Sequence, residues 1–272
     1  MYLTGVILVL VLSFAFLVPA RAQIPVPISI DAEPRYHRIA DKVQKICETE
    51  VPRIAAELGL TTIQPIQIDI TDDMRPYNRA HHGELPEWGV AFAMLEDNQI
   101  VVDVRRALRE YNSLDEVIPH ELSHLLVHQR APDVRFPLWF LEGLAQWQAG
   151  EWSMVKQWQL MQGVWMHSSP RLQDMYHSYP VDETRAQQAY RVAYEGFTEL
   201  FAEVGFKDLA PFLAEVERRQ SFEDGFKEFF GYSLADYQTY FQDDFEKRYG
   251  SSFMALQTGP LYAFAGALFL AV

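Results

Sequence analysis

The spacing of apolar residues near the start of the chain is helical. Residues 36–60 carry isoleucine, valine and leucine at roughly helical intervals, which predicts a long helix with one buried face. Pro52 is expected to bend or divide this helix, and Gly59 is placed to end it. The preceding residues 23–34 are interrupted by prolines and are expected to form an extended lead-in.

Strand-like alternation follows this helix. In residues 63–71 isoleucine alternates with polar side chains, which predicts a strand with one buried face. Two shorter apolar runs, 90–94 and 99–104, predict further strands that pair across a turn at 96–98. The polar segment 72–88 between them contains proline and glycine and is expected to be a loop.

Helical spacing dominates from Leu108 to about Tyr249. Strands therefore precede most of the helices, which predicts an α+β fold rather than alternating βα units. We expect an α+β lobe with a mixed sheet over residues 23–135 and a helical lobe over residues 136–250, with a cleft between them.

The N-terminus has the pattern of an export signal. The run from Val6 to Val18 is almost wholly apolar, and Ala20-Arg21-Ala22 matches the small-x-small pattern of a cleavage site. Residues 1–22 are therefore expected to be a signal peptide, although the first five residues contain no Lys or Arg. An uncleaved anchor and a buried N-terminal helix are the alternatives. Export would place the protein on the periplasmic or extracellular side.

The C-terminal residues 251–272 form an apolar tail, and residues 261–272 contain no charge. A membrane-spanning helix needs about 20 apolar residues. The tail reaches that length only by including a polar stretch at 257–260. We expect it to associate with a membrane as the start of a span; the alternative is a tail packed against the domain.

The charge balance limits the classes of partner. Acidic residues outnumber basic ones by 37 to 23, which gives a formal net charge of −14. Nucleic acid is not an expected partner, because its binding needs clustered Lys and Arg. The single cysteine, Cys47, cannot form a disulfide within the chain and is expected to be a buried core residue.

Residues 120–124 read His-Glu-Leu-Ser-His, which is a metal-binding pattern. On a helix, His120 and His124 project from one face a turn apart and can both ligate one zinc ion, while Glu121 lies where it can accept a proton from water. Ser113 and Glu116 match a capping box for this helix. Pro119 lies too deep for the first turn, so a bend or a helix start is expected there.

Glu142 is the candidate third ligand, because it lies in an otherwise apolar run and a buried carboxylate needs a partner. Two histidines and one glutamate, with the fourth position left for water, form a recognised catalytic zinc set. The alternative for Glu142 is a carboxylate placed at a helix N-terminus by the helix dipole. His128 competes as a ligand, but three successive turns of one straight helix are too collinear to surround a tetrahedral ion.

With these motifs, the chain resembles the gluzincin metallopeptidases, and most of all the small bacterial proteins with a peptidase MA-like domain. The matching segments are HELSHLLVHQ (120–129), PLWFLEGLAQW (137–147) and AYRVAYEGFTELFAEVG (189–205), with weaker similarity over 38–249. The resemblance implies a zincin fold, in which a twisted sheet precedes the active-site helix and its edge strand, here 90–94, holds an extended substrate.

One position departs from the pattern of that family. Gln146 stands a helical turn after Glu142, where an acidic residue that supports a metal ligand is common among gluzincins. Its amide can still hydrogen-bond a histidine ring, although it would raise the basicity of the ligand less than a carboxylate does.

The expected reaction is zinc-assisted hydrolysis of a peptide or protein substrate, with Glu121 as the general base. Tyr194, and next Tyr190, are candidates to stabilise the oxyanion, since both lie on one face of a helix beyond Glu142; ordinary core tyrosines are the alternative. The rival functions are a non-catalytic zinc-binding envelope module that recruits or assembles partners, and a membrane-tethered scaffold without metal. Glu121 favours the enzyme, because a structural site needs no base.

The first prediction concerns export. N-terminal sequencing of the protein isolated from its native host should begin at or near Gln23, because cleavage after Ala22 would remove the apolar leader. A cytosolic protein that still starts at Met1 would contradict this. If the tail 251–272 is an anchor, the mature protein should partition into membranes, and its removal should release the protein.

Overall fold

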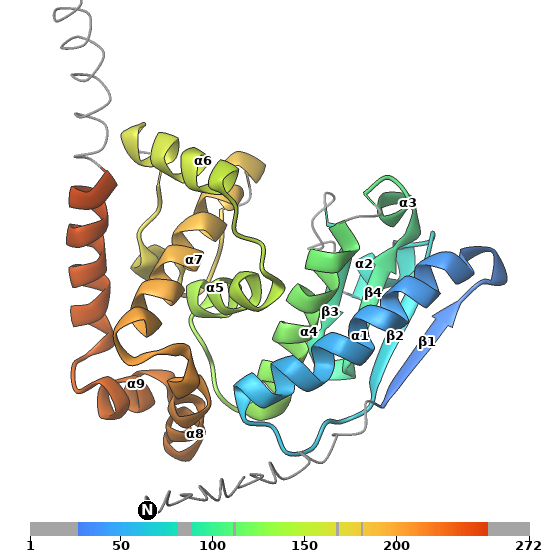
Figure 1. Cartoon of the computed structure of the whole chain (residues 1–272), viewed down its shortest axis with the longest axis horizontal. Coiled ribbons are helices and arrows are strands. Elements are labelled where there is room, and N and C mark those ends of the chain that lie inside the picture. The colour runs from blue at the N-terminus through green and yellow to red at the C-terminus, as the bar shows by residue number, and fades with distance from the viewer. Residues whose placement is uncertain (1–26, 81–88, 111–112, 167–168, 181, 250–272) are drawn as a thin grey trace, which may run out of the picture.

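The computed structural model describes residues 27–80, 89–110, 113–166, 169–180 and 182–249. They form two lobes, which lie side by side in Figure 1. The first lobe contains the sheet, and its elements are β1 (Ile28–Ala32), α1 (His37–Leu58), β2 (Ile66–Thr71), α2 (Arg75–Ala80), β3 (Ala91–Met94), β4 (Gln99–Asp103), α3 (Val104–Ala107) and α4 (Leu114–Arg130). The second lobe is helical, with α5 (Leu138–Ala149), α6 (Met154–Trp165), α7 (Glu183–Val204), α8 (Leu209–Arg219), α9 (Phe222–Phe230) and a last helix over 234–249. This arrangement confirms the α+β prediction.

The four described strands form one mixed sheet in the order β1-β2-β4-β3. Strands β1, β2 and β4 are parallel, whereas β3 pairs antiparallel with β4 and lies at an edge of the sheet. The predicted pairing of residues 90–94 with 99–104 is therefore confirmed. Strand β1 corrects the expected lead-in, because Ile28 to Ala32 pair residue by residue with Ile66 to Ile70.

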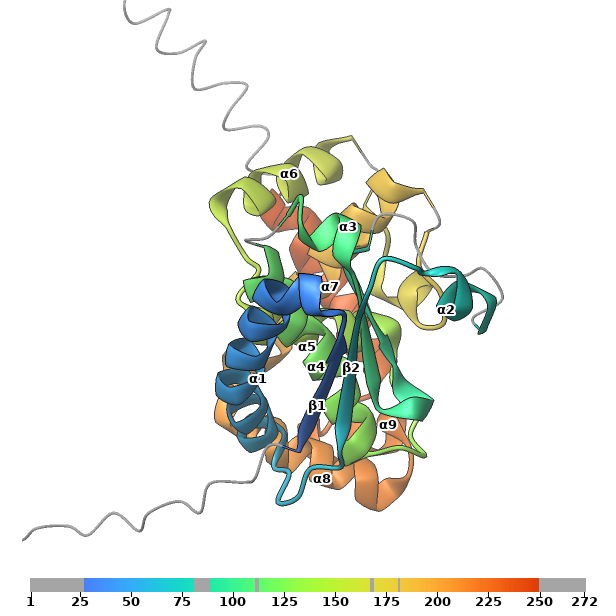
Figure 2. The ribbon, with the colours of Figure 1, turned by 90° about the vertical axis from the view of Figure 1, so that its right-hand side faces the viewer.

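Helices cover one face of this sheet. In β2 the side chains of Ile66, Ile68 and Ile70 are buried, and α1 and α4 pack against each other over that face (Figure 2). The opposite face of the sheet is polar around Asp69, which accepts hydrogen bonds from Tyr77 and Gln99 at 2.6 Å each. The sheet is therefore covered on one side by its helices, as its alternating sequence predicts.

Helix α1 confirms the first predicted helix with one correction. It ends at Gly59, whose φ of 71° lies in the left-handed region that glycine adopts without a steric cost. Pro52 lies inside α1 and does not divide it. Cys47 is fully buried on its inner face, as expected, and burial raises the pKa of its thiol to about 12.

Helix α4 differs in detail from the prediction. It begins at Leu114 and continues through Pro119, so the proline is not a helix start. The expected capping box is absent, because the Ser113 hydroxyl donates to the carbonyl of Glu110 at 2.6 Å instead of accepting from the helix N-terminus. The fixed φ of proline is compatible with a helix, and the tertiary packing of α4 against α1 and α5 compensates for the lost hydrogen bond.

The helical lobe is held together by aromatic side chains. Phe140 on α5 is fully buried and lies in edge-to-face contact with Phe197 of α7, Phe212 of α8 and Phe222 of α9, with ring centroids 5.0 to 5.7 Å apart. One side chain thus connects four helices of the lobe, and α5 is fixed in place from several directions.

The described helices include none that is long and apolar enough to cross a membrane. The predicted signal peptide over 1–22 and the apolar tail over 251–272 lie outside the described residues. Both therefore stay predictions, as do the boundaries drawn at 135 and 250.

The second prediction concerns the close contact of Gly143 on α5 with the backbone of α7. A Cβ added at Gly143 would lie 2.3 Å from the carbonyl oxygen of Ala193, which is a backbone atom that cannot rotate away. Gly143→Ala should therefore lower the free energy of unfolding by about 1–3 kcal/mol, as overpacking does, measured by denaturant titration. Gly196→Ala is the matched control, since the added Cβ meets only the flexible side chain of Leu172 and should cost less. Equal effects would contradict this account.

Candidate metal centre

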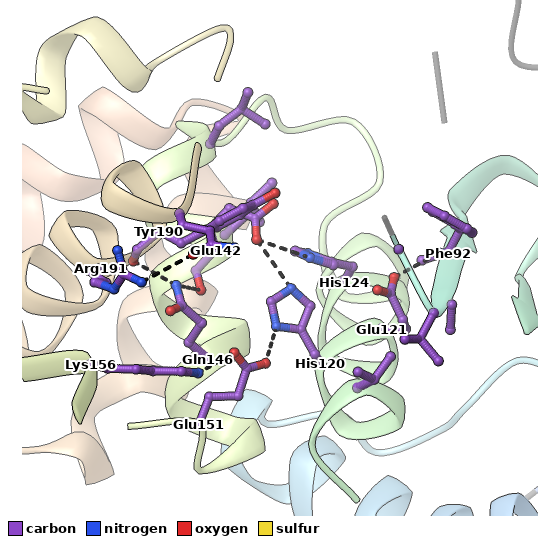
Figure 3. Close-up of a pocket in the computed structure, with 18 of the residues that line it drawn as sticks. Phe92, His120, Glu121, His124, Glu142, Gln146, Glu151, Lys156, Tyr190 and Arg191 are labelled. Atoms are coloured by element: carbon purple, nitrogen blue, oxygen red, sulfur yellow. Dashed lines mark hydrogen bonds and ion pairs between the residues drawn. The ribbon is translucent and has the colours of Figure 1, made fainter. Parts of the chain in front are cut away.

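Two histidines and one glutamate converge between the lobes (Figure 3). His120 and His124 lie one turn apart on α4, and Glu142 approaches them from α5. The Glu142 carboxylate oxygen lies 3.2 Å from Nε2 of His120 and 3.7 Å from Nε2 of His124. One ligand atom from each of the three residues lies within 4.8 Å of the other two, so the three side chains could hold a single metal ion.

The position of Glu142 explains why it needs a cation. It lies beyond the first turn of α5, where the favourable field of a helix N-terminus has largely faded. Its side chain is only 16% exposed. Burial acts to raise the pKa of Glu142, but His124 and His120 outweigh it and lower this pKa. The structure thus favours the ligand role over the helix-dipole alternative, and His128 is not among the clustered residues.

The second ring nitrogen of His120 is held by a residue that the sequence analysis did not single out. Nδ1 of His120 lies 2.7 Å from the carboxylate of Glu151, which in turn pairs with Lys156 at 3.3 Å. Burial acts to raise the pKa of Glu151, but His120 and Lys156 lower it to about 2, so it is ionised. An ionised Glu151 accepts a hydrogen bond from Nδ1–H and leaves Nε2 directed at Glu142, where a metal cation could bind.

Among the described residues, Gln146 forms no hydrogen bond with a histidine ring. Its amide donates to the backbone carbonyls of Tyr190 at 2.8 Å and Glu142 at 3.1 Å, and thereby ties α5 to α7. The supporting carboxylate expected at position 146 by resemblance is supplied instead by Glu151, just after the turn at Gly150 that ends α5.

Glu121 lies between the cluster and the sheet. Its carboxylate accepts a hydrogen bond of 2.8 Å from the backbone N–H of Ala93 on the edge strand β3. Burial raises the pKa of Glu121 to about 7, and Glu142 adds to this, while His120 opposes it. Burial likewise lowers the pKa of His124 to about 4, which favours the neutral imidazole that a metal requires.

The two candidate tyrosines have different surroundings. Tyr190 lines the cleft that contains the metal-binding cluster. Tyr194 packs face to face on Trp152 instead, with ring centroids 4.1 Å apart and the planes within 3° of parallel. The structure therefore reverses the order of preference and favours Tyr190.

A second aromatic hydroxyl lies near the cluster. Tyr179 stacks on Tyr190 at 4.9 Å, and its buried hydroxyl has no hydrogen-bond partner among the described residues. Burial raises the pKa of both tyrosines, and the charge of Glu142 adds to this, so both hydroxyls keep their protons and can donate. Tyr179 was not identified from the sequence, because it lies in an irregular segment without a motif.

The cleft runs between the two lobes. One wall consists of β3 and α4, which supply Ala93, His120, Glu121 and His124. The other consists of α5, α6 and α7, which supply Glu142, Lys156, Tyr190 and Arg191. A metal ion bound by His120, His124 and Glu142 would therefore bridge the two walls.

Comparison with known proteins agrees with this site. Residues 47–246 match the family model described as the peptidase MA superfamily, so the match includes every residue of the cluster. No curated protein and no solved structure matches the chain.

The third prediction concerns the support of His120 by Glu151. Glu151→Gln should weaken metal binding by about 10- to 100-fold, because a neutral amide holds the ring less firmly than a carboxylate does. His120→Ala and Glu142→Ala should abolish it, since each removes a ligand atom. Competition with a chelator of known affinity measures all three variants. Unchanged affinity in Glu151→Gln would show that this carboxylate does not support the site.

Proposed function

The chain belongs to the peptidase MA superfamily, and on that premise we propose that it is a zinc-dependent peptidase of the gluzincin type. The observation that carries this proposal is the convergence of His120, His124 and Glu142 beside Glu121 and an edge strand. Two imidazoles and one carboxylate are a donor set that zinc takes in catalytic sites, where a fourth position stays open.

Zinc held by these residues would supply a Lewis acid that activates water and polarises the scissile carbonyl. Glu121 is the proposed general base: it takes the proton as water attacks the carbonyl carbon, and it passes that proton to the amine as the C–N bond breaks. Its place beside His120 and His124 fits this role, since a structural metal site would need no buried carboxylate next to its ligands.

The edge strand β3 is the proposed binding surface for an extended peptide. An added strand would pair with the outward-facing backbone groups of β3, as in other complexes in which a peptide extends a sheet. Tyr190, on the opposite wall, is the proposed oxyanion donor, because its hydroxyl stays protonated and it lines the same cleft. The substrate would therefore lie between β3 and α7.

The fourth prediction separates an enzyme from a zinc-binding module. Glu121→Gln keeps an oxygen for the Ala93 N–H and removes the base. The zinc content and the melting temperature should stay nearly unchanged, while hydrolysis of a peptide found by library screening should fall by about 100-fold or more. Tyr190→Phe should lower turnover with zinc retained, because one oxyanion donor contributes about 3 kcal/mol.

Two outcomes of this test would contradict the proposal. Equal cleavage by the wild type and by Glu121→Gln would refute the role of the base. A zinc-loaded wild type that cleaves nothing in a broad library would make the non-catalytic module the better interpretation.

A further inference from the structure

Arg191 is a cation in the cleft that is held by neutral groups. It follows Tyr190 on α7 and lines the same cleft as the metal-binding cluster (Figure 3). Its guanidinium donates to three side-chain amide oxygens, those of Gln159 at 2.7 Å, Gln187 at 3.3 Å and Gln188 at 3.3 Å. These bonds orient the guanidinium, but amide oxygens carry no charge to neutralise it.

Arg191 differs from the other cations named here because they pair with a carboxylate. No carboxylate lies within ion-pair distance of Arg191 in the part of the chain that the structure describes. Lys156, the other cation named in the cleft, pairs with Glu151 at 3.3 Å, and the half-buried Arg53 pairs with Glu57 at 2.8 Å. The chain has 37 acidic residues to 23 basic ones, so carboxylates are abundant, yet glutamines surround this guanidinium.

A half-buried cation with neutral neighbours is suited to an anionic ligand. Burial acts alone to lower the pKa of Arg191, without an acidic neighbour to oppose it, yet a guanidinium stays charged at any physiological pH. Both N–H groups of Nη2 and one of Nη1 donate to the glutamines, so the N–H of Nε and the second N–H of Nη1 remain to donate charge-assisted hydrogen bonds to a carboxylate. The three glutamines thus hold a charged guanidinium in place at the cleft, with two of its N–H groups left for a ligand.

The carboxylate that Arg191 binds would belong to the substrate of the metal centre. Tyr190 and Arg191 are consecutive on α7 and line the same cleft as β3, along which the proposed peptide would lie. Four glutamates line the described cleft. Glu121, Glu142 and Glu151 are engaged with Ala93, the histidines and Lys156, and none of the four, Glu110 included, forms an ion pair with Arg191.

We propose that Arg191 is a specificity-determining residue that binds a carboxylate of the substrate, and that the enzyme therefore prefers peptides with an acidic group near the scissile bond. This inference rests on the proposed peptidase function. The carboxylate is either the C-terminus of the peptide or the side chain of an Asp or Glu, because both present the same chemistry to a guanidinium.

The test measures binding, so that it does not depend on turnover. Short N-acetylated peptides are titrated by calorimetry into zinc-loaded protein carrying Glu121→Gln, which keeps them intact. One set compares a free C-terminal carboxylate with a C-terminal amide, and a second compares internal Asp with Asn. Removal of the recognised carboxylate should weaken binding by about 10- to 100-fold, and the set that shows this loss identifies its source.

Substitution of the arginine completes the test. With Arg191→Gln added, the acid and its neutral counterpart should bind alike. Arg191→Lys should restore part of the preference, since it keeps the charge and loses the planar guanidinium. Arg185→Gln is the matched control on the same helix, where the exposed Arg185 should leave the preference unchanged.

Each remaining result overturns the assignment. Equal binding of acidic and neutral peptides in the presence of Arg191, a preference that survives Arg191→Gln, or no binding by any peptide would do so. Failure of the peptidase proposal itself would look different: the acid preference would depend on Arg191, while the wild type would hydrolyse none of the peptides.

Discussion

The structure depends on one constraint, which is that the carboxylate of Glu142 is buried in an apolar helix and needs polar or cationic partners. An unpaired buried carboxylate costs several kcal/mol, and α4 places Nε2 of His120 and of His124 3.2 Å and 3.7 Å from this one. The close contact of Gly143 with the backbone of α7 and the anchoring of Phe140 among three other helices hold α5 in that position. The contacts that hold α5 thus both join the two lobes and assemble the metal-binding cluster.

The sequence predicted the parts of this arrangement that depend on local spacing. The histidines four residues apart on a helix, the alternation in β2, and the paired strands β3 and β4 are all periodic, and periodicity is visible without a partner. Strand β1 was not predicted, because five residues in a proline-containing segment form a strand only by pairing with β2. Glu142 was found because a charge in an apolar run is anomalous.

The supporting residues could not be predicted in the same way. Glu151 contacts His120 because α5 ends at Gly150 and the chain turns there. No periodic pattern in the sequence indicates that contact. Tyr190 and Tyr194 are equivalent by helical spacing, and only the packing of Trp152 over Tyr194 distinguishes them. Residues that act through tertiary neighbours are therefore the ones that sequence patterns miss at this site.

The hydrogen bond between Glu121 and Ala93 has a consequence for the protein in solution. A free strand edge exposes backbone donors that can pair with the edge of another copy, which is a common route to aggregation. In the described structure β3 is such an edge, and the carboxylate of Glu121 engages its Ala93 donor. The short length of β3 and this engaged donor leave few backbone groups for pairing with a second copy, and a substrate strand along β3 would take the Ala93 donor from Glu121. Glu121, the proposed general base, therefore also occupies a backbone group through which two copies of the chain could pair.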